Sequence, residues 1–190
     1  MDTIPTHTKV INPVKKFLLV VFILFGFFAV LREFRRTPRF GTADNTLRIQ
    51  RIGSDGAVVS EDFQPRLAPY LAVYHGAGWC PPCQLFSPLL AEFYHDADKT
   101  KLRFQLVMVN YDRSDDDMIA YMRQHAMEFP AVRRGEAGGW GAATGRGIPN
   151  LIIIDTSTGR VVSSSYDGNT YQGCDRPLSV LRTIVAEGHP

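Results

Sequence analysis

Two cysteines separated by two prolines limit what this chain can fold into more than any other feature does. Cys80 and Cys83 lie in the stretch WCPPCQLFSP, residues 79–88. The apolar run before it, residues 67–75, ends at a glycine-rich turn and predicts a short buried strand. After Cys83, apolar side chains recur at spacings of three and four up to about residue 99, which predicts a helix. The pair is therefore expected where a strand gives way to a helix.

The start of a helix is a favourable place for a reactive thiol. Free backbone N–H groups and the positive end of the helix dipole stabilise an anion there and make a cysteine more acidic. We expect Cys80 to be the nucleophile and Cys83, one turn further on, to attack the mixed disulfide formed on Cys80. Pro81 and Pro82 have no N–H to donate to this sulfur, and they stiffen the loop between the cysteines.

Two other interpretations of the pair are weaker. A zinc site needs two further ligands, but the chain has no second CxxC, and His75 and His95 lack the spacing of a ligand pair. A purely structural disulfide between residues so close in sequence closes a very short loop and stabilises little. We therefore favour thiol–disulfide exchange and expect no metal. Cys174 has no obvious partner and is either a bystander or a regulatory thiol.

The N-terminal segment predicts a membrane anchor. Residues 17–31, FLLVVFILFGFFAVL, carry no charge. A helix of that length covers roughly 22 Å of a hydrocarbon core about 30 Å thick, so it can just span. A cleaved signal peptide is the alternative, but the charged residues that follow make a poor cleavage site. We interpret residues 17–34 as the anchor, 1–16 as an N-terminal tail and 35–46 as a linker.

The charge distribution argues against a nucleic-acid partner. The net charge of +2 is small, and the basic excess lies in the first 40 residues, with seven Lys or Arg against two acids. Basic residues flank the apolar run on both sides, so the positive-inside rule does not decide the orientation. We expect a single-pass protein of a bacterial inner membrane, with the short tail inside and the domain facing the periplasm.

The rest of the pattern predicts an α/β domain with a mixed central sheet flanked by helices. Residues 47–59 predict a hairpin, 102–110 a strand, and 151–166 two strands around a turn. Ser114, followed by three aspartates, predicts a helix start, and a last helix is expected over 177–187. A β-α-β unit followed by a hairpin predicts parallel and antiparallel strands in one sheet, with helices on both faces.

The segment around the cysteines also resembles a known family. Residues 76–94, GAGWCPPCQLFSPLLAEFY, resemble the active-site segment of the thioredoxin superfamily, in particular its tryparedoxin and nucleoredoxin-like branch. The resemblance implies a thioredoxin-like domain over residues 47–188. It also implies that Pro149 is cis, that the Ile148 backbone pairs with an incoming peptide strand, and that Trp79 shields the disulfide.

One position beside the redox pair departs from thioredoxin. Where thioredoxin has a buried aspartate that helps the second cysteine to lose its proton, this chain has Tyr74. Asp112, at the end of a predicted strand, is a candidate for that role, and an ordinary turn or capping acid is the alternative. We expect Tyr74, Asp112, Pro81 and Pro82 to tune the site.

These features together predict a membrane-anchored thiol–disulfide oxidoreductase that reduces protein disulfides and receives electrons from an unidentified donor. No organic cofactor is implied, because the Cys80–Cys83 disulfide itself carries the electrons. Two alternatives stay open. One is a dedicated reductase of apocytochrome thiols in cytochrome c maturation, and the other is a redox-inactive metallochaperone or binding module.

Overall fold

The computed structural model describes residues 47–53, 55–65, 67–97, 103–133, 135–136 and 147–187. The expected tail, anchor and linker over residues 1–46 lie outside these ranges, as do residues 137–146. Within the described ranges, no helix is both long enough and apolar enough to cross a membrane.

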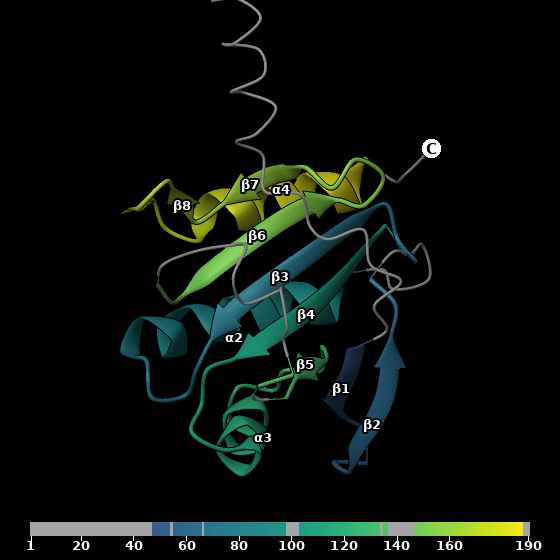
Figure 1. The fold of residues 1–190 in the computed structure, drawn as a ribbon, viewed down its shortest axis with the longest axis vertical. Coiled ribbons are helices and arrows are strands. Elements are labelled where there is room, and N and C mark those ends of the chain that lie inside the picture. Colours follow the sequence, from purple (N-terminus) through teal and green to yellow (C-terminus); the bar gives the residue numbers. More distant parts are fainter. Residues whose placement is uncertain are drawn as a thin grey trace, which may run out of the picture. The chain divides into compact units, whose positions relative to one another are not determined.

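A seven-stranded sheet forms the centre of the domain, with the strand order β2-β1-β5-β4-β3-β6-β7 (Figure 1). The strands are β1 (Leu47–Ile52), β2 (Val58–Phe63), β3 (Tyr70–Gly76), β4 (Phe104–Asn110), β5 (Ala131–Val132), β6 (Asn150–Asp155) and β7 (Val161–Ser164). β3 pairs with β4 in parallel and with β6 in antiparallel orientation. The predicted mixed sheet is therefore confirmed, and β3, which leads to the cysteines, lies near its middle.

Three helices are described: α2 (Pro81–Asp96), α3 (Asp115–Gln124) and α4 (Asp175–Ala186). Ser114 caps α3 as predicted, because its side-chain oxygen accepts the backbone N–H of Asp117 at 3.1 Å. Both α2 and α4 begin two residues earlier than expected. The physical reason is that the first turn of a helix does not use its N–H groups, so it tolerates proline.

The two faces of the sheet are covered differently. Side chains that alternate along the strands, such as Tyr74 and Met108, form one buried cluster with residues from all three helices. The opposite cluster, which includes Val73 and Val107, is made of strand residues alone within the described ranges. The prediction of helices on both faces is thus wrong for the described helices. A period of two shows which residues share a face, but it does not show which face a helix covers.

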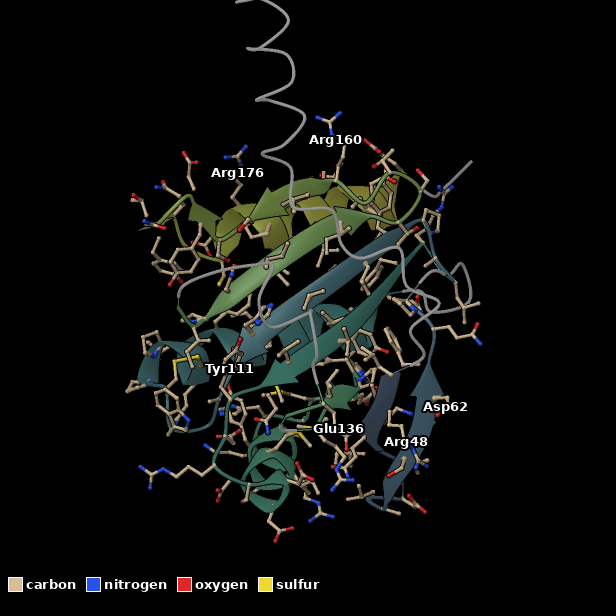
Figure 2. All side chains as sticks on the ribbon, in the orientation of Figure 1. Arg48, Asp62, Tyr111, Glu136, Arg160 and Arg176 are labelled. Atoms are coloured by element: carbon tan, nitrogen blue, oxygen red, sulfur yellow. A yellow bond between two sulfur atoms is a disulfide. The ribbon has the colours of Figure 1, made fainter. Side chains whose placement is uncertain are left out.

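Two small elements have no counterpart among the sequence predictions. β5 joins the N-terminal hairpin to β4, because Ala131 pairs with Gln50 on one side and with Met108 on the other. Two residues are too few to show a period, so the pattern could not indicate this strand. The second element is a separate hairpin of β8 (Tyr166–Asp167) and β9 (Thr170–Tyr171) that follows β7. On the surface, the side chains of Arg160, just before β7, and Arg176, on α4 (Asp175–Ala186), project away from the ribbon (Figure 2).

Candidate redox site

The cysteine pair lies at the N-terminus of α2, directly after the loop that follows β3, as predicted. Cys80 is the N-cap residue of the helix, and its sulfur accepts the backbone N–H of Cys83 at 3.3 Å. The two sulfurs are bonded, and the Cα atoms are 5.2 Å apart, within the usual range for a disulfide. Cys80 is 4% exposed and Cys83 is fully buried. Cys80 is therefore the sulfur that an incoming molecule reaches first.

The prolines leave a single backbone donor for this sulfur. Pro81 and Pro82 occupy the first two positions of α2 and carry no N–H. The N–H of Cys83, together with the helix dipole, is positioned to stabilise a thiolate on Cys80. This is the electrostatic arrangement that a nucleophilic cysteine needs.

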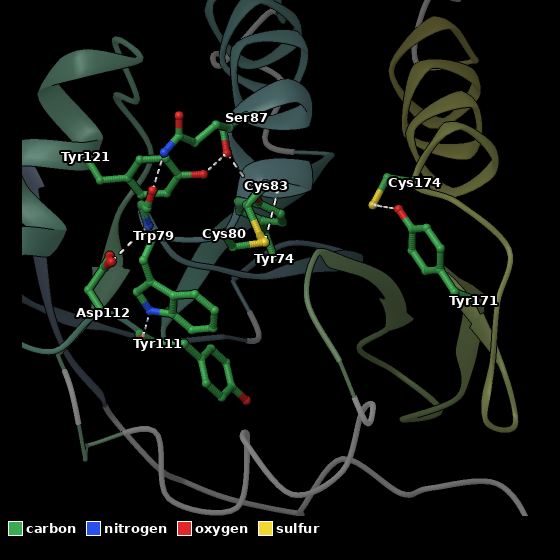
Figure 3. The surroundings of a disulfide bond; sticks show 12 residues. Tyr74, Trp79, Cys80, Cys83, Ser87, Tyr111, Asp112, Tyr121, Tyr171 and Cys174 are labelled. Atoms are coloured by element: carbon green, nitrogen blue, oxygen red, sulfur yellow. Dashed lines mark hydrogen bonds between the residues drawn. A yellow bond between two sulfur atoms is a disulfide. The ribbon is translucent and has the colours of Figure 1, made fainter.

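The Trp79 indole is fixed on the surface beside the pair. It is 59% exposed, and its Nε1–H donates to the backbone carbonyl oxygen of Tyr111 at 2.9 Å (Figure 3). The Tyr111 hydroxyl in turn lies 3.2 Å from Nδ1 of His75. His75 is buried, and that burial lowers its pKa to about 4, so the ring is neutral at physiological pH. The structure thus places His75 as a packed histidine.

Asp112 lies in the bend after β4 and is held against the loop that precedes Cys80. It is only 3% exposed, and its Oδ1 accepts the backbone N–H of Gly78 at 2.8 Å. Its other oxygen, Oδ2, is buried and has no hydrogen-bond partner among the residues that the structure describes. Burial raises the pKa of this carboxyl, although the N–H of Gly78 opposes the rise. A carboxylate in this state can take up a proton more readily than a surface acid.

Tyr74 takes part in a buried hydroxyl chain. Its hydroxyl lies 2.8 Å from Oγ of Ser87, which lies 2.5 Å from the hydroxyl of Tyr121 (Figure 3). All three residues are nearly or completely buried, and burial raises the pKa of both phenols, so they stay neutral. Ser87 and Tyr121 were not predicted. Ser87 could have been found from its place one turn after Cys83, whereas Tyr121 has no local signal.

The Ile148–Pro149 peptide bond is cis, as the resemblance implies. Strand register places this bond near the redox pair. Asn150, the first residue of β6, pairs with His75 of β3, and His75 is followed by the loop that carries Cys80. Pro149 therefore lies at the same edge of the sheet as the cysteines. Gly147, the residue before Ile148, lies close to the Tyr166 hydroxyl.

The third cysteine lies inside the domain. Cys174 is 4% exposed at the start of α4 and belongs to the same buried cluster as Cys83. The hydroxyl of Ser165 donates to its sulfur at 3.1 Å, and burial raises the pKa of the thiol. Within the described ranges, no three His, Cys, Asp or Glu side chains are grouped as ligands of a metal ion.

The fold and the cysteine pair of this domain have counterparts among known proteins. Residues 69–161 match the family model described as thioredoxin-like. The thioredoxin of Wuchereria bancrofti has a similar structure, with a TM-score of 0.51 at 26% identity over 73% of this chain and 95% of that one. Residues 69–161 thus form a thioredoxin-like domain, with Cys80 and Cys83 at disulfide distance.

Within this class, tryparedoxins and nucleoredoxins are homologues. The chain is 33% identical over 94 residues to tryparedoxin of Trypanosoma brucei brucei, which covers 48% of this chain and 65% of that protein. It is also 33% identical over 89 residues to nucleoredoxin of Danio rerio, which covers 46% of this chain and 21% of that protein. The chain thus spans less than two thirds of the length of either relative.

Proposed function

We propose that this chain is a membrane-anchored thiol–disulfide oxidoreductase that reduces protein disulfides. The observation that carries the proposal is the position of Cys80. Its sulfur caps α2, accepts the N–H of Cys83 and lies within bonding distance of the Cys83 sulfur. A stabilised nucleophile beside its own resolving thiol is what a cycle of thiol–disulfide exchange requires.

The cycle begins with both cysteines reduced. The Cys80 thiolate attacks one sulfur of a substrate disulfide, whose other sulfur leaves with the electron pair and takes up a proton. Cys83 then loses its proton and attacks Cys80. The Cys80–Cys83 bond forms as the bond to the substrate breaks, and the second substrate sulfur also leaves as a thiolate. Two electrons have moved to the substrate, and a dithiol donor must restore the enzyme.

Asp112 is the proposed acceptor of the proton that Cys83 loses. Its buried Oδ2 has no hydrogen-bond partner among the described residues, and its pKa is raised by burial. A base with a raised pKa is better matched to proton transfer near neutral pH than an ordinary carboxylate is. Tyr74 occupies the place of the thioredoxin aspartate but cannot act as a base, because its raised pKa keeps the phenol protonated.

The substrate is proposed to lie between Trp79 and the cis-proline segment. The exposed indole offers an apolar platform, and the backbone of Ile148 would pair with an extended peptide. Pro81 and Pro82 would hold the sulfurs in similar positions in both redox states, since proline restricts the backbone. No organic cofactor is needed, because the sulfurs carry both electrons.

The apolar run of residues 17–31 supports the proposed membrane anchor over 17–34. A linker of residues 35–46 would then join the anchor to the domain of residues 47–188. We propose that the domain faces the periplasm of a bacterial inner membrane. Labelling of reduced Cys80 in intact cells with a membrane-impermeant maleimide tests this. Labelling only after the inner membrane is permeabilised would place the domain inside.

A trapping experiment tests the proposed activity. Cys83→Ser should accumulate a mixed disulfide through Cys80, because the resolving thiol is gone, and Cys80→Ser should trap much less. The wild-type protein should reduce insulin in the presence of dithiothreitol. If Cys83→Ser traps no protein and the wild type leaves insulin oxidised, the proposed function is wrong. Bound metal without turnover would instead support a binding role.

A further inference from the structure

The buried hydroxyl chain of Tyr74, Ser87 and Tyr121 lies inside an otherwise apolar cluster. Polar groups in such a place are costly unless they are paired, and here each hydroxyl has at least one partner. The chain joins three separate elements, because Tyr74 lies on β3, Ser87 on α2 and Tyr121 on α3. Phenylalanine in place of each tyrosine and alanine in place of Ser87 would fill nearly the same space. Packing alone therefore does not explain the three hydroxyls.

The chain lies beneath the loop that carries the redox pair. Ser87 follows Cys83 by one helical turn, so both side chains lie on the same face of α2, and both are fully buried. A Cβ on Gly76 would collide with the ring of Tyr74, and a Cβ on Gly78 would come within 3.1 Å of the side chain of Tyr121. The side chains of both tyrosines therefore pack closely against the backbone at the start of this loop.

A count of protons shows what the chain has left to donate. Three hydroxyls carry three protons, and the two hydrogen bonds between them use two. When both phenols donate to Ser87, the spare proton is on the Ser87 hydroxyl, one helical turn after Cys83 on α2. The two bonds that Ser87 accepts also polarise its O–H group and strengthen it as a donor.

We propose that the hydroxyl chain of Tyr74, Ser87 and Tyr121 supplies the hydrogen-bond donor to the Cys83 sulfur. This donor stabilises the thiolate that resolves the mixed disulfide. The inference rests on the proposed role of Cys83 and adds to it. The proton of Cys83 still leaves to Asp112, and the Ser87 hydroxyl then donates to the thiolate left behind. Tyr74 and Tyr121 act through Ser87, so they are positioning residues.

Two titratable groups contribute to the raised pKa values of the tyrosines in this hydroxyl chain. Asp112, from the end of β4, contributes to the raised pKa of Tyr121, and Cys174, from the start of α4, contributes to that of Tyr74. A negative charge on either of these groups would oppose an anion on Cys83. The three paired hydroxyls carry no charge, so they add nothing that would oppose this anion.

A titration of the reduced full chain in detergent tests the inference. Cysteine labelled with carbon-13 at Cβ reports the ionisation of each thiol by NMR, without any turnover. Ser87→Ala should move the titration of Cys83 up by about one pH unit, a tenfold smaller thiolate fraction at a given pH. Ser87→Thr keeps the hydroxyl and should restore the wild-type value. Tyr74→Phe and Tyr121→Phe should give smaller upward shifts, since each removes one polarising bond.

Ser163→Ala is the matched control. Ser163 is also a buried serine, but its hydroxyl has no partner among the described residues, and it lies on β7, away from α2. In the Ser163→Ala variant, Cys83 should titrate at the same pH as in the wild type. The inference is overturned if Ser87→Ala folds and leaves the titration of Cys83 unchanged. Ser87 would then have a structural role alone, such as a hydrogen bond from its hydroxyl to the backbone carbonyl one turn earlier. If Ser87→Ala does not fold, Tyr74→Phe and Tyr121→Phe replace it, and an unchanged titration of Cys83 in both variants overturns the inference. Failure of the wild type to reduce insulin would count against the proposed function but not against this titration.

Discussion

The carboxylate of Asp112 accepts the backbone N–H of Gly78 at 2.8 Å and so ties the end of β4 to the loop that carries Cys80. The two residues are 34 positions apart in the sequence. This contact fixes one carboxylate oxygen and leaves the other buried without a partner among the described residues. Asp112 thus has a structural role, which is the hydrogen bond from Gly78, and a proposed chemical role, which is the uptake of a proton. A substitution can separate the two roles.

Asp112→Asn should separate them. The asparagine oxygen can still accept the N–H of Gly78, but the side chain no longer takes up a proton. We expect resolution of the mixed disulfide to slow by roughly tenfold or more, with little change in stability. Rapid acid quenching followed by mass spectrometry measures this step. Asp116→Asn removes an exposed charge from the start of α3 and should leave the rate unchanged. Equal rates in both variants would remove Asp112 from the mechanism.

Gly147→Ala should disturb the segment that precedes the cis-proline. The added methyl group would collide with the hydroxyl of Tyr166, whose ring packs against Tyr171 with centroids 5.2 Å apart. We expect a loss of about 1 kcal/mol in stability and a few-fold lower kcat/KM for insulin. Adding Tyr166→Phe removes the colliding oxygen and should restore most of both. A double variant as impaired as Gly147→Ala would show that the collision is not the cause.

His75→Gln should change how stability depends on pH. The unfolded histidine titrates near 6.5, whereas burial lowers the pKa in the folded protein to about 4. Between these values the unfolded state binds more protons, so the free energy of unfolding decreases as the pH falls. The histidine accounts for about 2–3 kcal/mol of this loss between pH 7.5 and 4.5.

Urea denaturation of both proteins at pH 7.5 and 4.5 measures the difference. The wild type should lose more stability than His75→Gln over this interval. The raised pKa of Asp112 acts in the opposite sense, because the folded state then binds the extra proton, but it is common to both proteins. Parallel pH profiles would mean that His75 is not kept neutral in the folded protein.

Cys174 should be unreactive in the folded, reduced protein. Its burial raises the pKa of the thiol, and a protonated thiol is a poor nucleophile. Labelling with iodoacetamide followed by mass spectrometry should modify Cys80 first, and Cys174 only when the protein is denatured. Alkylation of Cys174 at the rate of Cys80 under native conditions would instead indicate a regulatory thiol.

The sequence alone was sufficient wherever the signal is local. Apolar runs, spacings of three and four, and the capping residue Ser114 depend on neighbours within one or two turns, and they predicted β3, α2, α3 and the mixed sheet. The same holds for the cysteine pair, because a strand, a turn and a helix in succession place Cys80 at a helix N-terminus. Chain order alone predicted the parallel pairing of β3 and β4.

Contacts between distant residues were decided by the tertiary structure alone. β5 was missed because a strand of two residues exists only through its partners on either side. The face covered by the described helices was missed because periodicity does not specify a side of the sheet. The chain of Tyr74, Ser87 and Tyr121 joins a strand and two helices, and the burial that keeps it neutral arises only when these elements pack together.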